Sequence, residues 1–426
     1  MVDFSSAVYQ NEFLPDQGTD VHAIVQLTCQ GAGSAGRSGL GEVGEIIIVD
    51  ASGSMMGDRI EMAKRAAAVA VDSILDGTWF AIVAGTHQAF LAYPRVLNGQ
   101  GMVRMDPSSR LAAKSAIASF RADGGTAIGQ WLLLARKLFA SVPSLVGRHT
   151  ILLTDGEDYN ETPTQLDSAI RQCIGQFQAD CRGIGVDWKV NEVRKIAQAL
   201  LGSVDIIPDA HDLPQIMAGL VQQAMSRGVA DAQLRVWIPQ DAQILFVRQV
   251  SPTVEDLTHR GSPINPLTQG YPTGAWGDES RDYHIAVRLP AKSLGVEQLA
   301  ARVQLAVGAQ VLTQGLVKAR WSADPGLTAQ ISPEVAHYTG QTELALAIQE
   351  GLAARAAGDD RTATVKLGRA VQLAAQTGND EATSKLRRVV EVADATSGLV
   401  KLRRDVDKAD EMALDTASTK TTRIRG

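Results

Sequence analysis

The chain has 426 residues, which is enough for roughly three domains of ordinary size. Apolar residues make up 45% of the chain and charged residues 21%, a composition that excludes a disordered protein. The net charge of −6 gives no electrostatic support for nucleic-acid binding, so we expect no nucleic-acid partner.

Residues 1–43 predict two strands and a linker. The strands are expected at Ser6 to Phe13 and at Val21 to Thr28, with the turn Pro15-Asp16-Gln17-Gly18 between them. Gly31 to Gly44 is rich in glycine. We interpret it as a flexible linker, because no helix follows that could present backbone N–H groups to a phosphate.

Residues 44–227 alternate between strands and helices. The apolar run Ile46 to Val49 predicts a strand buried on both faces of a sheet, and Arg148 to Thr154 predicts another. Helical patterns lie between the predicted strands. Alternation of this kind predicts a doubly wound, mostly parallel sheet with helices on both faces.

Side chains with hard oxygen atoms follow three segments of this α/β region. They are Asp50, Ser52, Ser54, Thr126 and Asp155. The first three follow the apolar run at a spacing of two, the fourth precedes a helical run, and the fifth ends the second strand. The carboxyl ends of parallel strands share one edge of a sheet, where open α/β folds bind ligands. Oxygen ligands without His or Cys suit Mg²⁺ or Mn²⁺ better than zinc.

The order D-x-S-x-S, then G-G-T, then T-D-G resembles the von Willebrand factor type A domain with a complete metal-ion-dependent adhesion site, of a bacterial intracellular type. The resemblance covers about residues 44–226. It implies that Ser52, Ser54 and Thr126 contact the metal directly, and that Asp50 and Asp155 act directly or through water. It also implies that a protein partner supplies an acidic ligand. The alternative is that these side chains only cap helices.

An acidic cluster follows Asp155 in the sequence. Glu157, Asp158 and Glu161 attract a cation but repel an acidic side chain of a partner. We therefore expect either a basic partner surface around a single acidic ligand, or a metal with a purely structural role.

Residues 228–325 predict an all-β module. Five strands are expected between Gln233 and Lys318, and a long loop rich in Pro and Gly is expected from Thr258 to Arg281. The two amino-terminal strands have no place in the α/β sheet. We assign them to this module as a β-sandwich, with the α/β domain inserted between sandwich strands.

Residues 326–415 predict a helical bundle. Glycines punctuate this region at about 20-residue spacing and separate apolar stripes of helical period. The last two stripes are expected at Leu386 to Ala393 and at Leu399 to Ala409.

Residues 416–426 are polar and predict a disordered tail. Thr419, Thr421 and Thr422 are candidate phosphorylation sites. The sequence around Thr421, with Ile424 three positions on, resembles sites that bacterial Ser/Thr kinases phosphorylate and that forkhead-associated domains bind. The alternative is a solvated tail without a role.

Catalytic motifs are missing from the sequence, so we expect no enzyme. It has no H-E-x-x-H, no G-x-S-x-G and no Walker lysine. The cysteines at 29, 173 and 181 have no zinc spacing and predict buried thiols, with a Cys173–Cys181 bridge as the alternative. The sequence shows neither a secretory signal nor a membrane span, so we expect a cytoplasmic protein without a membrane partner.

Two functions fit these observations. The first is an intracellular scaffold or adaptor that binds a protein through the metal site, with a signalling role for the tail. The alternative is a regulatory subunit of an AAA+ ATPase or chelatase-like complex, since the chain has no nucleotide motif of its own.

Overall fold

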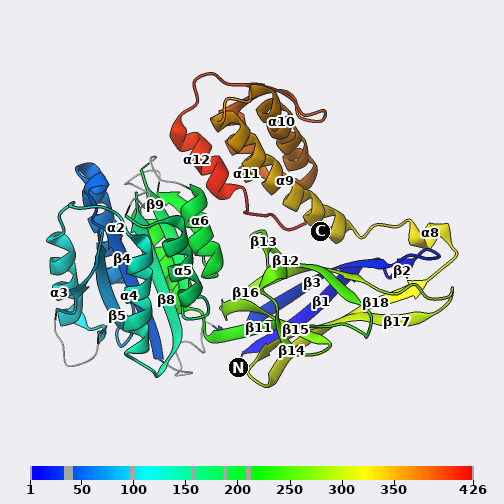
Figure 1. The fold of residues 1–426 in the computed structure, drawn as a ribbon, viewed down its shortest axis with the longest axis horizontal. Coiled ribbons are helices and arrows are strands. Elements are labelled where there is room, and N and C mark those ends of the chain that lie inside the picture. Colours follow the sequence, from blue (N-terminus) through cyan, green and yellow to red (C-terminus); the bar gives the residue numbers. More distant parts are fainter. Residues whose placement is uncertain are drawn as a thin grey trace. The chain divides into compact units, whose positions relative to one another are not determined.

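The computed structural model divides into two compact units (Figure 1). The inserted unit comprises residues 32–230 with 274–277, and the flanking unit comprises the remainder of the chain. The structure describes residues 2–32, 42–95, 101–155, 160–185, 190–207 and 213–424. Most of the predicted glycine-rich linker lies outside these residues. None of the described helices is both long enough and apolar enough to cross a membrane.

The inserted unit is built on a mixed sheet with the strand order β10-β9-β8-β4-β5-β6, and β7 pairs with β5. The first five of these strands are parallel, whereas β6 and β7 are antiparallel. The strands are β4 (Glu42–Asp50), β5 (Trp79–Gly85), β6 (Ala89–Tyr93), β7 (Val103–Arg104), β8 (Leu145–Thr154), β9 (Gln178–Ile184) and β10 (Val204–Ile207). The predicted α/β fold with a mostly parallel sheet is confirmed.

Helices cover both faces of this sheet (Figure 1). One face packs against α2 (Asp58–Ser73), α3 (Pro107–Ala118) and α7 (Leu213–Met225) through alternate strand residues such as Ile47 and Val49. The remaining helices are α4 (Ile128–Ala140), α5 (Pro163–Cys173) and α6 (Val190–Ala199). Gly85 lets α4 approach the sheet closely, because a Cβ atom there would overlap the Trp131 ring.

The strand order reverses at β4, which has β5 on one side and β8 on the other. The connections that leave the carboxyl ends of β4 and β8 therefore diverge and leave room between them. The short 3₁₀ helix η1 (Gly53–Met55) follows β4 directly, and Gly57, with φ +84°, turns the chain into α2. The segment with three of the predicted site residues thus lies at the reversal of the sheet.

Two mostly antiparallel sheets form one part of the flanking unit, and only the pairing of β2 with β18 is known to be parallel among the pairings described. The five-stranded sheet has the order β1 (Asp3–Gln10), β3 (Asp20–Gln30), β16 (Glu279–Arg288), β12 (Gln243–Ser251), β13 (Glu255–Asp256). The six-stranded sheet has the order β14 (Ser262–Asn265), β15 (Thr268–Trp276), β11 (Val229–Trp237), β17 (Glu297–Val307), β18 (Gln310–Trp321), β2 (Phe13–Leu14). The strands that precede the inserted unit therefore pair with strands that follow it.

The predicted Pro/Gly loop from Thr258 to Arg281 is wrong, because β14 and β15 form a hairpin within it. Two prolines lie on these strands. Pro263 lies on β14, the terminal strand of the sheet order, where a missing N–H costs the ladder little. Pro272 lies on β15, where Tyr271 and Thr273 on either side are buried. The hydroxyl of Thr273 also donates a hydrogen bond of 2.6 Å to the Ala232 carbonyl of β11.

The carboxyl-terminal part of the flanking unit is mostly helical, with α8 (Pro325–Thr328), α9 (Pro333–Ala356), α10 (Asp360–Thr377), α11 (Asp380–Val389) and α12 (Lys408–Ala417). The hairpin of β19 (Val390–Asp394) and β20 (Leu399–Leu402) corrects the helices predicted across these residues. Val390 and Val392 favour an extended backbone, and Gly398, with φ +69°, makes a turn that a helix cannot contain.

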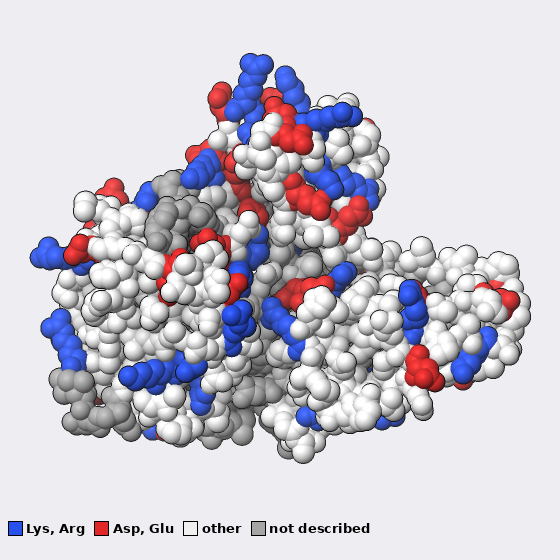
Figure 2. All heavy atoms as spheres, in the orientation of Figure 1, with Lys and Arg blue, Asp and Glu red and all other residues white. Residues whose placement is uncertain are grey.

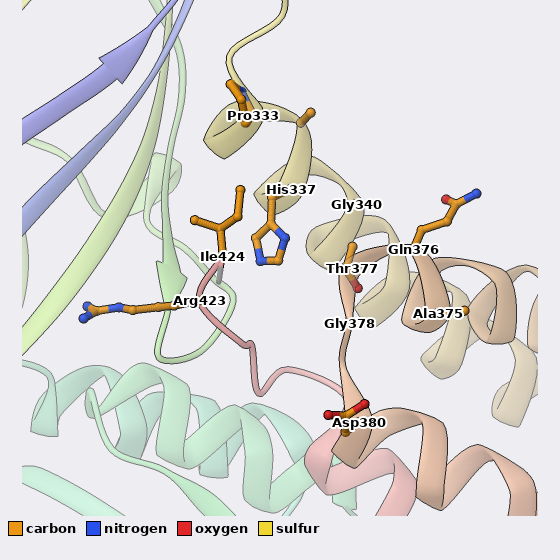
Figure 3. Close-up of a pocket in the computed structure, with 11 residues that line it drawn as sticks. Pro333, His337, Gly340, Ala375, Gln376, Thr377, Gly378, Asp380, Arg423 and Ile424 are labelled. Atoms are coloured by element: carbon orange, nitrogen blue, oxygen red, sulfur yellow. The ribbon is translucent and has the colours of Figure 1, made fainter. Parts of the chain in front are cut away.

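The prediction of a disordered tail is wrong for the described residues up to Ile424. Helix α12 continues to Ala417, and Thr416 is only 1% exposed. Lys420 then forms an antiparallel bridge with Thr253 beside β12. His337 of α9 lies beside this segment (Figure 3), with its Nε2 2.8 Å from the Thr422 carbonyl oxygen. The polar tail is ordered because backbone groups beside β12 and side chains of α9 satisfy its hydrogen bonds.

Candidate metal centre

Asp50 ends β4 with both carboxylate oxygens engaged. Its Oδ1 accepts a hydrogen bond of 2.8 Å from the backbone N–H of Ser52, and its Oδ2 accepts one of 2.7 Å from the Thr154 hydroxyl. Thr154 is the last residue of β8, so the neighbouring strand fixes the Asp50 side chain. Thr154 is a site residue that the sequence analysis missed, although its position just before Asp155 is a signal for it.

A chain of hydrogen bonds joins the loop after β4 to the loop after β8. The hydroxyl oxygens of Ser52 and Ser54 lie 2.9 Å apart, and the Ser54 hydroxyl donates to Asp155 Oδ1 at 2.8 Å. Two segments that are about a hundred residues apart in sequence therefore present their oxygen atoms to the same place.

The loop that carries Thr126 packs against the same segment. The backbone N–H of Gly53 donates to the Gly124 carbonyl at 2.8 Å, and that of Asp123 donates to the Ala51 carbonyl at 2.9 Å. Thr126 itself is 2% exposed, and its N–H donates to Asn160 Oδ1 at 2.9 Å. The sequence analysis also missed Asn160, which holds this loop in place.

Four of the five predicted ligands are almost inaccessible to solvent, and Ser54 is exposed. The pKa of Asp50 is raised to about 6, because burial and, to a smaller extent, the charge of Asp155 outweigh the hydrogen bonds from Ser52 and Thr154, which lower it. Two buried carboxylates close together are unfavourable without a compensating positive charge. The site therefore has the electrostatic character that a divalent cation compensates.

The donor set fits a hard cation. The described residues contain no group of three or more His, Cys, Asp or Glu that could hold a metal. The candidate centre instead combines the carboxylates of Asp50 and Asp155 with the hydroxyls of Ser52 and Ser54, and the loop of the predicted ligand Thr126 packs beside it. Mg²⁺ and Mn²⁺ accept such oxygen ligands, whereas zinc prefers nitrogen and sulfur. The residues present thus fit Mg²⁺ or Mn²⁺.

The sequence analysis did not identify one basic side chain that contacts the centre. Arg59, in the first turn of α2, places Nη1 2.9 Å from Asp155 Oδ2 and 3.4 Å from the Ser54 carbonyl oxygen. The signal in the sequence is a basic residue five positions after the last serine of D-x-S-x-S.

Glu161 does not have the role expected for the acidic cluster after Asp155. The Glu161 carboxylate accepts hydrogen bonds from the Gly129 N–H, at 2.7 Å, and from the Gln130 side chain, at 3.3 Å. Its charge therefore lies at the amino end of α4, where the helix dipole favours an anion. Glu157 and Asp158 lie outside the described residues.

A second ionisable cluster lies inside the same sheet, among Glu45 of β4, His149 of β8 and Asp180 of β9. His149 Nδ1 lies 2.8 Å from Glu45 Oε1, and Nε2 lies 2.9 Å from Asp180 Oδ2. Asp180 Oδ1 also accepts two hydrogen bonds of 2.6 Å from the N–H and hydroxyl of Ser203. All three side chains are buried, and each imidazole nitrogen contacts a carboxylate. These contacts connect the strands β4, β8 and β9.

Charged side chains of both signs are interspersed on each unit in the face of the molecule shown in Figure 2. The described cysteines, Cys29, Cys173 and Cys181, are buried free thiols, and burial raises the pKa of Cys173 to about 11. They match the sequence-based expectation of buried thiols, and the alternative Cys173–Cys181 bridge is wrong.

Comparisons with known proteins agree with the observed fold. The model of the von Willebrand factor type A domain matches residues 45–206, and that of the von Willebrand factor type A C-terminal domain matches residues 372–418. A solved structure described as von Willebrand factor type A from Catenulispora acidiphila is 48% identical. It aligns with a TM-score of 0.92 over 99% of this chain and 97% of that one.

Two further matches are more distant. One is a similarity of fold, and the other is a similarity of sequence over part of the chain. The ArnB paralog VWA2 from Sulfolobus acidocaldarius aligns over 98% of both chains with a TM-score of 0.59 but only 15% identity, which shows the fold alone. An uncharacterized protein from Synechocystis sp. is 27% identical over 218 residues, and this match covers about half of each chain, 50% of this one and 49% of that one.

Proposed function

The chain belongs to the von Willebrand factor type A family, and from this premise we propose that it is an adaptor that binds a protein partner through a divalent cation at the Asp50 centre. Domains of this family commonly mediate protein interactions and often bind a divalent metal at the adhesion site. The cation would be Mg²⁺ or Mn²⁺, held by Asp50, Ser52, Ser54, Thr126 and Asp155. The proposed role is binding and not catalysis.

One observation carries this proposal: the hydrogen-bonded chain Ser52–Ser54–Asp155, which brings oxygen atoms from two strand ends together above a buried Asp50. The hydroxyls are neutral ligands, so they reduce the positive charge of a bound cation less than carboxylates do. A cation held in this way attracts a further anionic ligand. The exposure of Ser54 leaves that side of the centre open to a partner's Asp or Glu.

The test is capture of partner proteins by the full chain in buffer with Mg²⁺ and in buffer with a chelator. Ser52→Ala removes a hydroxyl from the centre but keeps the strand end intact, so we expect loss of the Mg²⁺-dependent partners, at least tenfold by quantitative mass spectrometry. An AAA+ ATPase among those partners would place the protein in the alternative class, that of a regulatory subunit.

The matched control is Ser115→Ala, which removes an exposed hydroxyl from α3 of the same unit, where it donates to the Leu111 carbonyl. This control should keep all partners. Thermal unfolding of both variants checks that they fold. The same set of partners with Ser52→Ala as with the wild-type chain would refute the proposed function.

Phosphorylation of the carboxyl-terminal segment is the second part of the proposal. The hydroxyl of Thr421 donates to the Val250 carbonyl at 2.7 Å and to the Pro252 carbonyl at 3.1 Å. The Thr422 hydroxyl accepts from Gln341 Nε2 at 3.0 Å. A phosphate on Thr421 has no hydrogen for the two carbonyls and repels them. Modification of Thr419, Thr421 or Thr422 would thus release the segment for a kinase-linked partner such as a forkhead-associated domain.

A further inference from the structure

The carboxyl-terminal segment, residues 419–424, begins as a short antiparallel strand in the flanking unit. The N–H of Val254 donates to the Thr419 carbonyl at 2.7 Å, and the N–H of Thr421 donates to the Pro252 carbonyl at 3.0 Å. These two backbone hydrogen bonds lie on either side of the antiparallel bridge beside β12. The segment is thus paired with the connection between β12 and β13 in the way that an edge strand pairs with its neighbour.

Helix α9 contacts the next residues of the segment. Nε2 of His337 donates to the Thr422 carbonyl at 2.8 Å, and Nε2 of Gln341 donates to the Thr422 hydroxyl at 3.0 Å. Ile424 and His337 both border a pocket of about 530 Å³ between α9 and the turn from α10 to α11 (Figure 3). A helix therefore holds the segment as well as the backbone beside the sheet.

A buried carboxylate binds the side chain of Arg423. Asp282 of β16 is 2% exposed, and its Oδ1 lies 3.4 Å from Nη2 of Arg423 and accepts a hydrogen bond of 3.1 Å from Gln26. Its Oδ2 accepts a hydrogen bond from the Tyr338 hydroxyl of α9. A buried carboxylate is costly without a positive partner. The guanidinium supplies positive charge to Asp282 while the segment is docked.

The docked segment does not present Thr421 to a kinase. A protein kinase needs the acceptor hydroxyl to donate its proton to a catalytic carboxylate. The Thr421 hydroxyl instead donates its hydrogen to the carbonyls of Val250 and Pro252. A forkhead-associated domain that also binds the residue three positions on needs Ile424, which borders the pocket beside α9. Both recognition events therefore require a released segment.

We infer that docking is autoinhibitory: Thr421 is phosphorylated only in the released state, and the contacts with α9 and Asp282 set the rate. In this step a kinase transfers the γ-phosphoryl group of ATP to Thr421 Oγ1. The new O–P bond replaces the bond to the departing ADP, and the hydroxyl proton passes to the kinase carboxylate. The phosphate then repels the two carbonyls and keeps the segment released. The inference rests on the phosphorylation proposed above and adds the order of events, in which release comes first.

The experiment compares two substrates, the full chain and a free peptide of residues 416–426. The probe is a bacterial Ser/Thr kinase, chosen from a panel because it phosphorylates the peptide, together with ATP. Mass spectrometry measures phosphate on Thr421. We expect the peptide to react faster than the full chain by on the order of tenfold or more, because only the released fraction of the chain reacts.

His337→Ala removes the donor to the Thr422 carbonyl but leaves the sequence that the kinase binds unchanged. It should speed phosphorylation of the full chain about fivefold, the effect of losing one hydrogen bond, and speed hydrogen exchange of residues 419–424 by a similar factor. His337→Gln keeps an N–H donor at this position and should restore part of the inhibition.

Thr339→Ala is the matched control. It removes an exposed hydroxyl of α9 that donates to the Val335 carbonyl, and it should leave both rates within about twofold of the wild type. Circular dichroism and thermal unfolding verify that every variant is folded.

Two results would overturn the inference while phosphorylation of the segment stands. One is a full chain that is phosphorylated as fast as the peptide, and the other is a His337→Ala chain that is phosphorylated no faster than the wild type. If no kinase of the panel phosphorylates the peptide, the proposed phosphorylation and this inference fail together, and binding through the metal centre is unaffected.

Discussion

His149 illustrates at the scale of one residue how the sheet holds charge in its interior. Burial alone lowers the pKa of an imidazole, but here the charges and hydrogen bonds of Glu45 and Asp180 outweigh burial and raise the pKa of His149 to about 9. Burial alone would likewise raise the pKa of Asp180, yet the contact with His149 holds it well below its ordinary value. The protonated imidazole is therefore part of the folded state at neutral pH.

Stability should fall in alkaline solution for this reason. The pKa of His149 is higher in the folded chain than the ordinary 6.5, so its contribution is fully present below about pH 6.5 and is lost as the pH rises through 9. We expect the free energy of unfolding, measured by urea titration, to drop by about 2 kcal/mol between pH 7 and pH 9.5.

His149→Gln should cost roughly 3–5 kcal/mol at pH 7, because it leaves two buried carboxylates without their partner, and it should remove most of the alkaline loss. His259→Gln, at an exposed position, is the control and should retain the alkaline loss. Parallel pH profiles for the wild type and His149→Gln would show that the imidazole is not the group that titrates.

At the scale of elements, the β19–β20 hairpin shows where helical periodicity misled the prediction. Its turn at Gly398 packs directly on Gly368 of α10, so that a Cβ atom at Gly368 would overlap the Gly398 carbonyl oxygen. The apolar residues that suggested a helical stripe, such as Val390 and Val400, are buried in the same core as α10. Burial against a neighbour and not local preference determined this hairpin.

Gly368→Ala should therefore destabilise the flanking unit by about 1–3 kcal/mol, although alanine favours a helix more than glycine does. Chemical denaturation monitored by circular dichroism measures this loss. Gly340→Ala is the matched control on α9, where the added Cβ would meet only the Thr377 methyl group, at 3.0 Å. Equal stability of the two variants would contradict the close approach of backbone to backbone.

At the scale of the whole molecule, the two ends of the flanking unit depend on each other. Strand β3, which precedes the inserted unit, lies between β1 and β16 and pairs with both. The carboxyl-terminal segment in turn contacts the same five-stranded sheet, since Arg423 reaches Asp282 of β16 at 3.4 Å and Lys420 bridges Thr253. Parts that are far apart in sequence must be present together for this unit to form.

Release of the carboxyl-terminal segment can be tested by introducing a negative charge at single positions. Thr421→Glu mimics the charge of a phosphate and loses the donor to Val250 and Pro252, so we expect faster hydrogen exchange of residues 419–424 and a lower unfolding temperature. Thr419 contributes its backbone carbonyl to Val254, so Thr419→Glu should have less than half this effect. Equal exchange in both variants would argue against Thr421 as the position that controls docking.

The sequence by itself determined the α/β fold and where the oxygen-bearing side chains lie, because the apolar runs and the residues at their ends are local signals. It also placed Ser52, Ser54 and Asp155 in segments that meet, since parallel strands present their carboxyl ends at one edge. Only the tertiary structure decided that Arg59 contacts Asp155, that Glu161 lies at the amino end of α4 and that the polar tail is ordered. These outcomes depend on partners that distant segments supply. Neither spacing nor composition shows which distant group will pair with a given charge or hydrogen-bond with a given backbone group.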